Sequence, residues 1–409
     1  MPPGRSISTR ELRSHFTTSS DHSFTQTKAC GDQFAAQPFY DYHSGPMEWT
    51  KPQYSGTRRT KAGIALAQDR ETEEDLSVID NWRSSHALPL QTIKMLLKIR
   101  AKSVDSSAVV AQRLKRLPSI RAKLKRETMR LQQMQDLGGC RAIVKDMGAV
   151  RKLIQKFDES FVKNPKTLEL RRHELVYTDD YILNPKSDGY RSLHYVLEYR
   201  PSTLHLMDFA GHLIEVQIRT HLQHAWATAV EIVDTFTGQS LKSALKTNIG
   251  DKDWRRFFAL ASNMFAIEEA SPQVPNMPDS YLACKRELRA LASKTNVESV
   301  LSGLKTAVET VVSGRSRRGA STYVLRLDVK ARRFYITEFD REDAAQLFLF
   351  EEERTFASNP TVQIVQVSVE KMQALRTAYP NYYLDTSMFN EALRRAIAPV
   401  RRKRKKQAA

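Results

Sequence analysis

Hydrophobic residues between positions 78 and 130 recur at intervals of three and four, which is the spacing of one face of an α-helix. The series begins with Val78, Ile79 and Trp82 and continues with Leu88, Leu90, Ile93, Leu96, Leu97 and Ile99. The spacing predicts a helical lead-in over residues 78–130.

Between Cys140 and Ile218 the pattern changes to short runs in which hydrophobic and polar residues alternate. The runs are CRAIV, LHYVLEY, TLHLMDF and LIEVQIR. Alternation with a period of two predicts strands, whereas the stretch from Gly148 to Phe161 has helical spacing. Helical spacing returns over residues 221–270. Strands with flanking helices predict an α+β fold with a mixed β-sheet.

A second series of elements follows Pro272, Pro275 and Pro278, which mark a boundary. Helical spacing over residues 281–312 comes first. The strands TYVLRLDV and RRFYITEF, the helix DREDAAQLFLFEEER and the strand TVQIVQVSV come next, followed by helices from Glu370 onwards. The pattern predicts a second small α+β domain of unknown role.

The two ends of the chain differ in composition from the rest. The N-terminal segment is rich in Ser and Thr and poor in aliphatic residues, so we expect it to be disordered. The final run RRKRKKQAA is either a solvated tail or a phosphate-binding arm. Within the chain, the run SGRSRRGAS is typical of a basic loop. The expected organisation is a disordered segment, a main domain, a second domain and a basic tail, at residues 1–45, 46–270, 280–398 and 399–409.

Composition narrows the class of protein. Apolar residues make up 41% of the 409, enough to fill real cores, and no run is long enough to span a membrane. With no apolar signal core at the N-terminus, we expect a cytoplasmic protein without a membrane partner, and a homo-oligomer stays open. Cys30, Cys140 and Cys284 have no disulfide or zinc spacing. The net charge of +18 favours polyanionic partners, which include nucleotides, nucleic acid and ribonucleoprotein surfaces.

The run RLKRLPSIRAKLKR carries the first cluster of candidate residues. Ten Lys and Arg but only two acidic residues lie between Arg100 and Arg130. Like charges on one helical face repel one another, so a multiply charged anion is a natural counterpart, although a solvated basic helix is the alternative. The candidates in this run are Arg113, Lys115, Ser119, Arg121, Lys123, Lys125 and Arg126.

Asp136 is the second candidate, in the run QDLGGCRAIV. It precedes a Gly-Gly turn and a strand on which Arg141 and Ile143 alternate. A carboxylate at the start of a strand, close to many cations, suits an Mg²⁺ ion bound to a polyphosphate. An ordinary turn residue is the alternative.

The third candidate is the loop in YILNPKSDGYRSLHYVLEY, which is rich in turn-forming residues and presents Lys186, Tyr190 and Arg191. An aromatic ring beside cations suits stacking on a nucleobase with a phosphate nearby. Tyr190 packed into the core is the alternative.

The fourth candidate is the run HLIEVQIRTHLQHAWATAVE. Period-two alternation places Glu215, Gln217 and Arg219 on one strand face. These groups either serve chemistry or line a solvent-exposed face. His221 and His224 have a spacing that suits a metal pair, but roles in the helix start and the core are more common for such residues.

Taken in order, the four segments resemble the synthetase domain of the RelA/SpoT alarmone-synthetase family. Arg113, Lys115, Ser119 and Lys123 resemble its ATP-binding segment, and Asp136 with Gly139 and Arg141 resembles its Mg²⁺-binding strand entry. NPKSDGYRSLH resembles the acceptor loop, and EVQIRTHLQHAWA resembles the strand and helix with the catalytic glutamate. The resemblance covers residues 80–240, and no His-Asp hydrolase pair occurs, so a short synthesis-only member is expected.

The resemblance implies a reaction and a role for each residue. ATP would give its β,γ-diphosphate to the 3′-hydroxyl of GDP or GTP, forming (p)ppGpp, with Mg²⁺ held by Asp136 and Glu215. Glu215 would also deprotonate the acceptor hydroxyl, and Tyr190 would stack on guanine. ATP would be bound by Arg113, Lys115, Ser119, Arg121, Lys123 and Arg141. The acceptor would be bound by Lys186, Tyr190, Arg191, His194, Gln217 and Arg219.

Two alternatives stay open. Related toxins resemble this domain and transfer diphosphate to the 3′ end of tRNA, and the excess positive charge suits that acceptor as well. In that case the extra C-terminal domain would serve as a built-in neutraliser of the toxin or as a sensor. A catalytically silent module that binds RNA or a ribosome is the second alternative, which the intact Asp136 and Glu215 disfavour.

Overall fold

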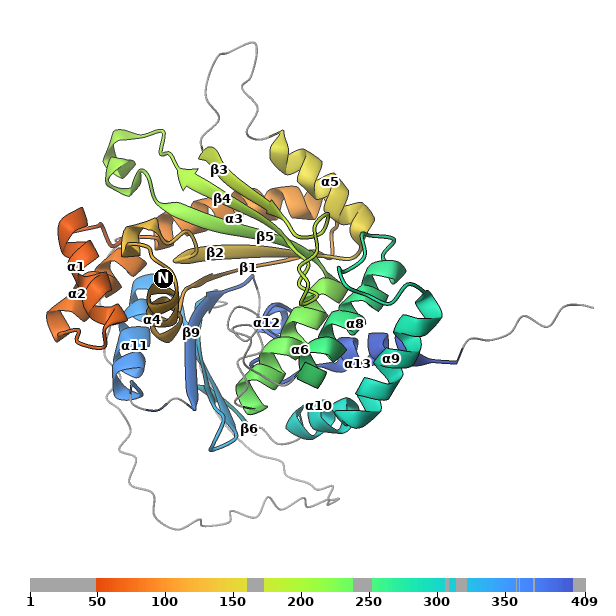
Figure 1. The fold of residues 1–409 in the computed structure, drawn as a ribbon. Coiled ribbons are helices and arrows are strands. Elements are labelled where there is room, and N and C mark those ends of the chain that lie inside the picture. Colours follow the sequence, from red (N-terminus) through yellow and green to blue (C-terminus); the bar gives the residue numbers. More distant parts are fainter. Residues whose placement is uncertain are drawn as a thin grey trace, which may run out of the picture. The chain divides into compact units, whose positions relative to one another are not determined.

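A long β-sheet forms the centre of the computed structural model of this chain (Figure 1). The structure describes residues 49–159, 173–237, 252–305, 309–313, 322–357, 359, 361–370 and 372–399. Among these, nine strands pair in the order β3-β4-β5-β2-β1-β9-β7-β8-β6. Their bounds are β1 Val109–Leu114, β2 Gly138–Val144, β3 His173–Asp180, β4 Leu193–Tyr199, β5 Leu213–Thr220, β6 Glu309–Ser313, β7 Thr322–Asp328, β8 Arg333–Phe339 and β9 Val362–Ser368.

The sheet is mixed, as the sequence predicts. Strands β2 and β5 run parallel, and so do β6 and β8, while the other neighbouring pairs are antiparallel. The α+β prediction with a mixed sheet flanked by helices is therefore confirmed.

Helices cover both faces of the sheet (Figure 1). α3, α5 and α11 lie on one face, and α6, α8, α12 and α13 lie on the other. The helical bounds are α1 Gly56–Ala67, α2 Glu73–Ser84, α3 Ala87–Val104, α4 Leu117–Arg126, α5 Met147–Asp158, α6 His221–Thr237, α8 Lys252–Glu268, α9 Tyr281–Lys294, α10 Val297–Lys305, α11 Glu342–Thr355, α12 Met372–Ala378 and α13 Ser387–Ile397, with short 3-10 helices η1 Leu131–Gln133 and η2 Leu204–Phe209.

The predicted second domain is not confirmed as a separate unit. β9 pairs with β1, so the C-terminal strands continue the same sheet. Phe389 of α13 is fully buried against Phe257, Phe258 and Phe265 of α8, within one hydrophobic core that also includes β7, β8 and β9. Truncating a buried Phe costs about 3–5 kcal/mol, so this contact ties the C-terminal segment firmly to α8.

Three local predictions differ from the structure, and one strand is not predicted at all. The predicted helical lead-in contains strand β1, because VVAQRL lies in the middle of the sheet with only Arg113 exposed, and such a largely buried short run has no distinctive period. TLHLMDF forms the 3-10 helix η2 instead of a strand. Strand β6 forms where the sequence predicts the end of the helix over residues 281–312. Strand β3 has few apolar residues, and the sequence pattern does not predict it as a strand.

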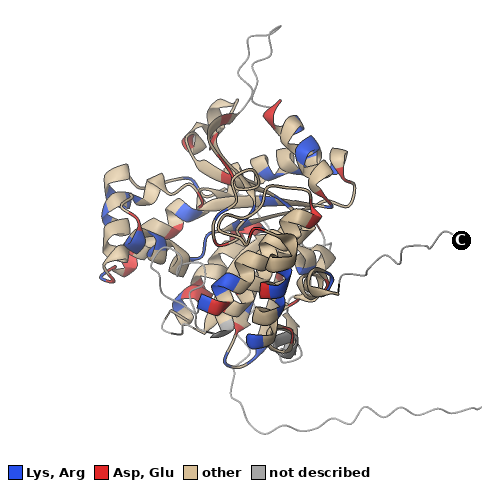
Figure 2. Cartoon of the chain, turned by 45° about the vertical axis from the view of Figure 1, so that its right-hand side comes forward, with Lys and Arg blue, Asp and Glu red and all other residues tan. Residues whose placement is uncertain are grey.

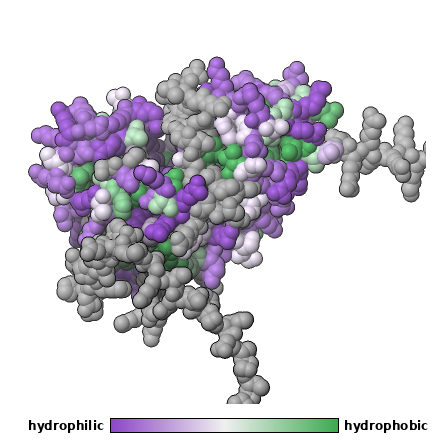
Figure 3. Space-filling model, turned by 90° about the horizontal axis from the view of Figure 1, so that it is seen from below, coloured by the Kyte–Doolittle hydropathy of each residue, from purple (hydrophilic) through white to green (hydrophobic). Residues whose placement is uncertain are grey.

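Several predictions lie outside the described residues, namely the N-terminal segment 1–45, the loop SGRSRRGAS and the run RRKRKKQAA. Across the part of the chain that is described, no helix is long and apolar enough to cross a membrane. Figure 2 shows basic and acidic residues interspersed over the helices, and the face in Figure 3 is mainly hydrophilic, with small hydrophobic patches.

Candidate active site

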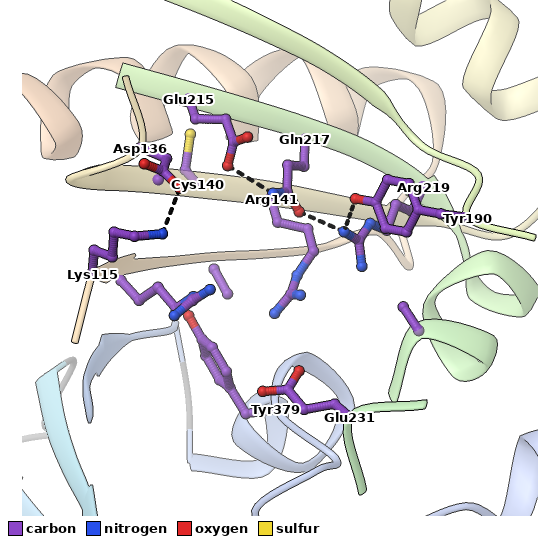
Figure 4. Close-up of a pocket in the computed structure, with 14 residues that line it drawn as sticks. Lys115, Asp136, Cys140, Arg141, Tyr190, Glu215, Gln217, Arg219, Glu231 and Tyr379 are labelled. Atoms are coloured by element: carbon purple, nitrogen blue, oxygen red, sulfur yellow. Dashed lines mark hydrogen bonds and ion pairs between the residues drawn. The ribbon is translucent and has the colours of Figure 1, made fainter. Parts of the chain in front are cut away.

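A polar pocket lies where β1, β2 and β5 meet α6 and the chain after α12 (Figure 4). Its cavity volume is about 120 Å³. Predicted site residues from all four sequence segments line it: Arg113, Lys115, Asp136, Arg141, Tyr190, Glu215, Gln217 and Arg219.

Strand register places these side chains on one face. In the parallel β2–β5 pair, Gly139 lies opposite Glu215, and Arg141 lies opposite Gln217. In the antiparallel β1–β2 pair, Arg113 lies opposite Gly139. Because directly opposite residues point to the same side of a sheet, three strands present their polar positions to one pocket.

Asp136 lies at the start of β2 between two lysines. Its Oδ2 accepts a hydrogen bond from Lys115 Nζ at 2.6 Å, and its Oδ1 accepts one from Lys123 Nζ at 3.0 Å. Burial alone would raise the pKa of Asp136, but the two ammonium groups outweigh burial and lower the pKa below its usual value. Burial also lowers the pKa of Lys115. Asp136 is therefore a carboxylate in a cationic setting, and Lys123 joins the site through it.

A closed ring of hydrogen bonds surrounds Glu215. His194 Nδ1 lies 2.9 Å from Glu215 Oε1, and His194 Nε2 lies 2.7 Å from the Tyr190 hydroxyl. Arg219 Nη2 donates to the Tyr190 hydroxyl at 2.5 Å and to Gln217 Oε1 at 2.8 Å. Gln217 Nε2 donates to Glu215 Oε2 at 2.7 Å and closes the ring. Both carboxylate oxygens of Glu215 thus have a fixed partner.

The ring determines the charge state of Glu215. Burial opposes ionisation, yet the interaction with His194 and the Gln217 hydrogen bond outweigh it, so the pKa of Glu215 falls to about 2. Glu215 is therefore a carboxylate at any physiological pH, which makes it a good ligand and orienting group but a weak base.

Tyr190 follows a tight turn that α8 holds in place. Gly189 has a φ of 94°, and a Cβ on it would lie 2.8 Å from the Ser262 side chain, so no other residue fits. Ser262 Oγ donates to the Gly189 carbonyl at 2.5 Å. Lys186 Nζ lies 5.6 Å from the Tyr190 ring centroid and 4.0 Å from that of Tyr181. The result is a fixed aromatic ring beside a cation.

Positive charge is concentrated at the pocket. Burial and the proximity of Arg219 and Arg113 lower the pKa of Arg141 to about 10. Arg141 Nη2 donates to the Ala378 carbonyl at 2.7 Å, and its guanidinium carbon lies 5.4 Å from the Tyr379 ring centroid. Crowded cations repel one another, so an anion such as a polyphosphate would relieve the strain of bringing them together.

Asp136 and Glu215 are the carboxylates that could hold a metal ion. Both line the pocket, and the charge of Glu215 raises the pKa of Asp136. Mg²⁺ needs only one or two protein carboxylates when phosphates and water complete its shell, so this donor set fits it. Within the described residues, no group of three or more His, Cys, Asp or Glu could hold a metal ion alone.

Four of the residues predicted to bind ATP or the acceptor lie elsewhere, and so do the candidates Lys125 and Arg126, which pair with Asp69 and Glu127. Arg191 is only 2% exposed and binds Glu269 Oε2 at 2.6 Å, so it anchors the loop to α8 and does not face the pocket. Arg121 pairs with Asp69 and Glu71. Ser119 lies in the first turn of α4, and Lys186 contacts the pocket only through the Tyr190 ring. The sequence places Arg191 in a turn-rich loop, but it does not reveal that Glu269, 78 residues later in the chain, binds its guanidinium.

His224 has a core role instead of a metal role. Its Nε2 lies 3.1 Å from the Thr377 carbonyl, and burial lowers its pKa well below the usual value. Sequence reasoning missed two pocket residues, Glu231 of α6 and Tyr379, which follows α12. Glu231 is the last residue of the fourth candidate run but was not singled out there, whereas Tyr379 lies outside all four segments, so the local sequence carries no signal for it.

Comparison with known proteins supports these observations. A family model described as the region found in RelA / SpoT proteins matches residues 112–233. No curated protein matches the chain.

Three solved structures are similar to parts of the chain. A GTP pyrophosphokinase family protein from Streptococcus pneumoniae is 22% identical, with 49% of this chain and 91% of that chain covered and a TM-score of 0.36. Small alarmone synthetase 1 from Bacillus subtilis, bound to its product pppGpp, is 19% identical, with 55% of this chain and 96% of that chain covered and a TM-score of 0.29. Small alarmone synthetase 2 from Bacillus subtilis is 18% identical, with 56% of this chain and 98% of that chain covered and a TM-score of 0.31.

All three TM-scores are below 0.5, so the assignment rests on the matched region. That region begins in β1 and ends in α6, and it includes Arg113, Lys115, Asp136, Tyr190 and Glu215. Residues 112–233 of this chain therefore form a RelA/SpoT-type region.

Proposed function

We propose that this chain is a pyrophosphokinase that transfers the β,γ-diphosphate of ATP to the 3′-hydroxyl of GDP or GTP. The observation that carries the proposal is the hydrogen-bond ring that joins the carboxylate Glu215 to the aromatic Tyr190. Such a ring fixes a charge-stabilising group and a base-stacking group relative to each other, as transfer to a ribose hydroxyl requires.

The cations of the pocket suit the ATP side of the reaction. Arg113 and Arg141 approach from neighbouring strands, and Lys115 and Lys123 flank Asp136. As the O3′–Pβ bond forms and the bond between Pβ and the bridging oxygen of the α-phosphate breaks, negative charge moves onto AMP. Fixed cations stabilise this charge without reorganising.

Glu215 and Tyr190 suit the acceptor side. Tyr190 stacks on guanine, and the bonds of its hydroxyl to His194 and Arg219 orient the ring. Glu215 accepts the hydrogen bond of the 3′-hydroxyl and takes its proton. Because the pKa of Glu215 is about 2, this proton moves only once the new O–P bond has made the hydroxyl acidic.

A bound Mg²⁺ ion would neutralise phosphate charge and align the diphosphate group with the hydroxyl. Asp136 and Glu215 would hold it. If Asp136 held the metal, it would pair less tightly with Lys115, and the Lys115 ammonium group would then be available to a phosphate oxygen.

Pocket size bears on how nucleotides enter. The cavity of about 120 Å³ is smaller than the roughly 300–1,000 Å³ typical of small-molecule sites. Tyr379 and the Ala378 carbonyl occupy the side next to Arg141. Two nucleotides therefore need this part of the C-terminal segment to move outwards.

A tRNA 3′ end is the second candidate acceptor, and the net charge of +18 favours it. Following a tRNA requires contacts to many phosphates, and each contact released by salt weakens binding. Tyr190 sits instead in a single tight turn and can stack on only one base. We therefore favour the free nucleotide.

The test uses the purified full-length protein with γ-phosphate-labelled ATP, Mg²⁺ and either GDP, GTP or deacylated tRNA. We expect label on the guanine nucleotide, with a shallow dependence on salt and complete loss in EDTA. Label on tRNA alone, falling steeply with salt, would replace the first acceptor with the second. Label on neither acceptor, with RNA still bound, would identify a silent binding module.

A further inference from the structure

A buried ion-pair network connects helix α11, which lies in the C-terminal segment, to the start of α4. Arg83 of α2 is 0% exposed, and its Nη1 and Nη2 donate to both carboxylate oxygens of Glu353 of α11, at 3.2 and 2.6 Å. Asp80 lies 3.3 Å from the same guanidinium. α2, α4 and α11 lie together at the left of Figure 1. Two helices far apart in sequence are thus held by one charged contact.

Glu353 also caps α4, which has no cap of its own. The N-cap residue Arg116 makes no side-chain capping bond, and Pro118 in the first turn has no N–H. The N–H groups of Ser119 and Ile120 bond to the Arg116 carbonyl. The remaining first-turn N–H, that of Leu117, donates to Glu353 Oε1 at 3.2 Å. A carboxylate at a helix N-terminus is favourable because it faces the positive end of the dipole.

The same network holds the main chain of Lys115. The Lys115 N–H donates to the Leu137 carbonyl at 2.8 Å, and its carbonyl accepts a bond from Arg83 Nη1 at 3.4 Å. Its Nζ binds Asp136 at 2.6 Å. The turn from β1 into α4 is therefore fixed between the sheet on one side and the Arg83–Glu353 pair on the other.

We propose that Glu353 is a positioning residue for the phosphate-binding segment from Lys115 to Lys123, so that the C-terminal segment completes the ATP site through α11. The proposal rests on the proposed function and deepens it. Glu353 touches no substrate. It acts by fixing the main chain that aims both lysines at Asp136, and a displacement of about 1 Å in such a segment can cost up to 10²-fold in rate.

The chain offers a matched control next to Glu353. Glu352 lies on the same helix, is equally buried and pairs with Arg326 of β7 at 2.7 Å. It faces the C-terminal strands and not α4. Glu352→Gln therefore removes a comparable buried charge without touching the turn that carries Lys115.

The experiment measures KM for ATP, KM for the guanine nucleotide, thermal stability and the affinity for a non-hydrolysable ATP analogue. For Glu353→Gln we expect KM for ATP and the dissociation constant of the analogue to rise about tenfold, with KM for the acceptor unchanged. Glu352→Gln should keep wild-type values for both nucleotides.

A double variant separates positioning from stability. Replacing both partners, Arg83→Met with Glu353→Met, restores apolar packing, because a buried ion pair is often replaced by hydrophobic residues without loss of stability. Asp80 keeps its ion pair with Arg354 in this variant. We expect this variant to melt near the wild-type temperature and still bind the ATP analogue about tenfold more weakly.

The outcomes are separable. Wild-type protein that binds no ATP analogue would overturn both the proposed function and the positioning role. Wild-type protein that binds and transfers, with Glu353→Gln or the double variant matching it in ATP affinity, would overturn the positioning role alone. Equal losses for both nucleotides would assign Glu353 a purely structural part.

Discussion

One face of a single sheet has opposite character in its two halves. In β1, β2 and β5 it carries Arg113, Arg141, Glu215, Gln217 and Arg219. Directly across the β1–β9 pair, Arg113 lies opposite Val367, and from there the face is apolar through β9, β7 and β8. Its apolar residues, which are buried in the core under α8 and α13, are Val365, Val367, Leu325, Leu327, Phe334 and Ile336.

The difference separates binding from folding. Burying apolar side chains stabilises the C-terminal half, whereas burying charges costs free energy unless each is paired. In the other half, pairing is achieved by the ring around Glu215 and by the two lysines at Asp136. A protein selected for stability alone would continue the apolar face, so the polar half fits the charged ligand proposed above.

The largest expected effect comes from removing the charge at the centre of the polar half. Glu215→Gln keeps the shape but abolishes the carboxylate, so turnover should fall by about 10²-fold or more. Glu198→Gln is the control, since Glu198 lies on neighbouring β4 and pairs with Arg200 away from the pocket. Near-normal turnover in a folded Glu215→Gln protein, measured by diphosphate transfer, would contradict the role of Glu215.

Removing the aromatic ring should have the next largest effect. Tyr190→Ala loses a base stack worth about 1–3 kcal/mol, so KM for the acceptor should rise far more than KM for ATP. Tyr190→Phe keeps the ring but loses the bonds to His194 and Arg219, and should show a smaller rise. Steady-state kinetics with each substrate varied in turn will check this. An equal rise for both substrates would argue against stacking.

Breaking the ring at His194 should change the pH profile. Glu215 contributes stability above about pH 4.5 that is lost as the pH falls towards its folded-state pKa of about 2. His194→Gln places its amide near the former Nε2 and loses the bond to Glu215, so the pKa of Glu215 should rise and the acid limb of kcat/KM should move up by about one pH unit. His194→Asn, which keeps a donor near Nδ1, should move it less. Coinciding acid limbs in all three proteins would show that His194 does not set the charge of Glu215.

The smallest effect is expected from removing the ring of Tyr379, which follows α12 and lines the pocket. Tyr379→Ala enlarges the cavity and exposes Arg141, so KM for ATP should fall about two- to tenfold, the value of one net hydrogen bond. Tyr383→Ala is the control, because Tyr383 packs on Phe334 outside the pocket. Melting temperatures should fall in both variants, and a KM change common to both would rule out a specific effect of Tyr379.

Local patterns predicted β5 and the pocket-facing set on it, because a period of two places Glu215, Gln217 and Arg219 on one side whatever the strand packs against. They did not predict β1, because all of its residues except Arg113 are buried or half-buried, which hides any period. Arg191 shows the same limit for a side chain, since its partner Glu269 lies 78 residues away and captures it in the core. Short-range spacing says nothing about such a contact.

The sequence alone determined the residue types, their order in four segments and the RelA/SpoT resemblance, since these depend on covalent order and local period. Only the tertiary structure decided that His194 links Glu215 to Tyr190, that the C-terminal strands extend the same sheet, that Tyr379 lines the pocket and that Glu353 caps α4. Strand register and helix packing set these contacts, and both are properties of the whole folded chain, because each contact forms only when distant segments are buried together.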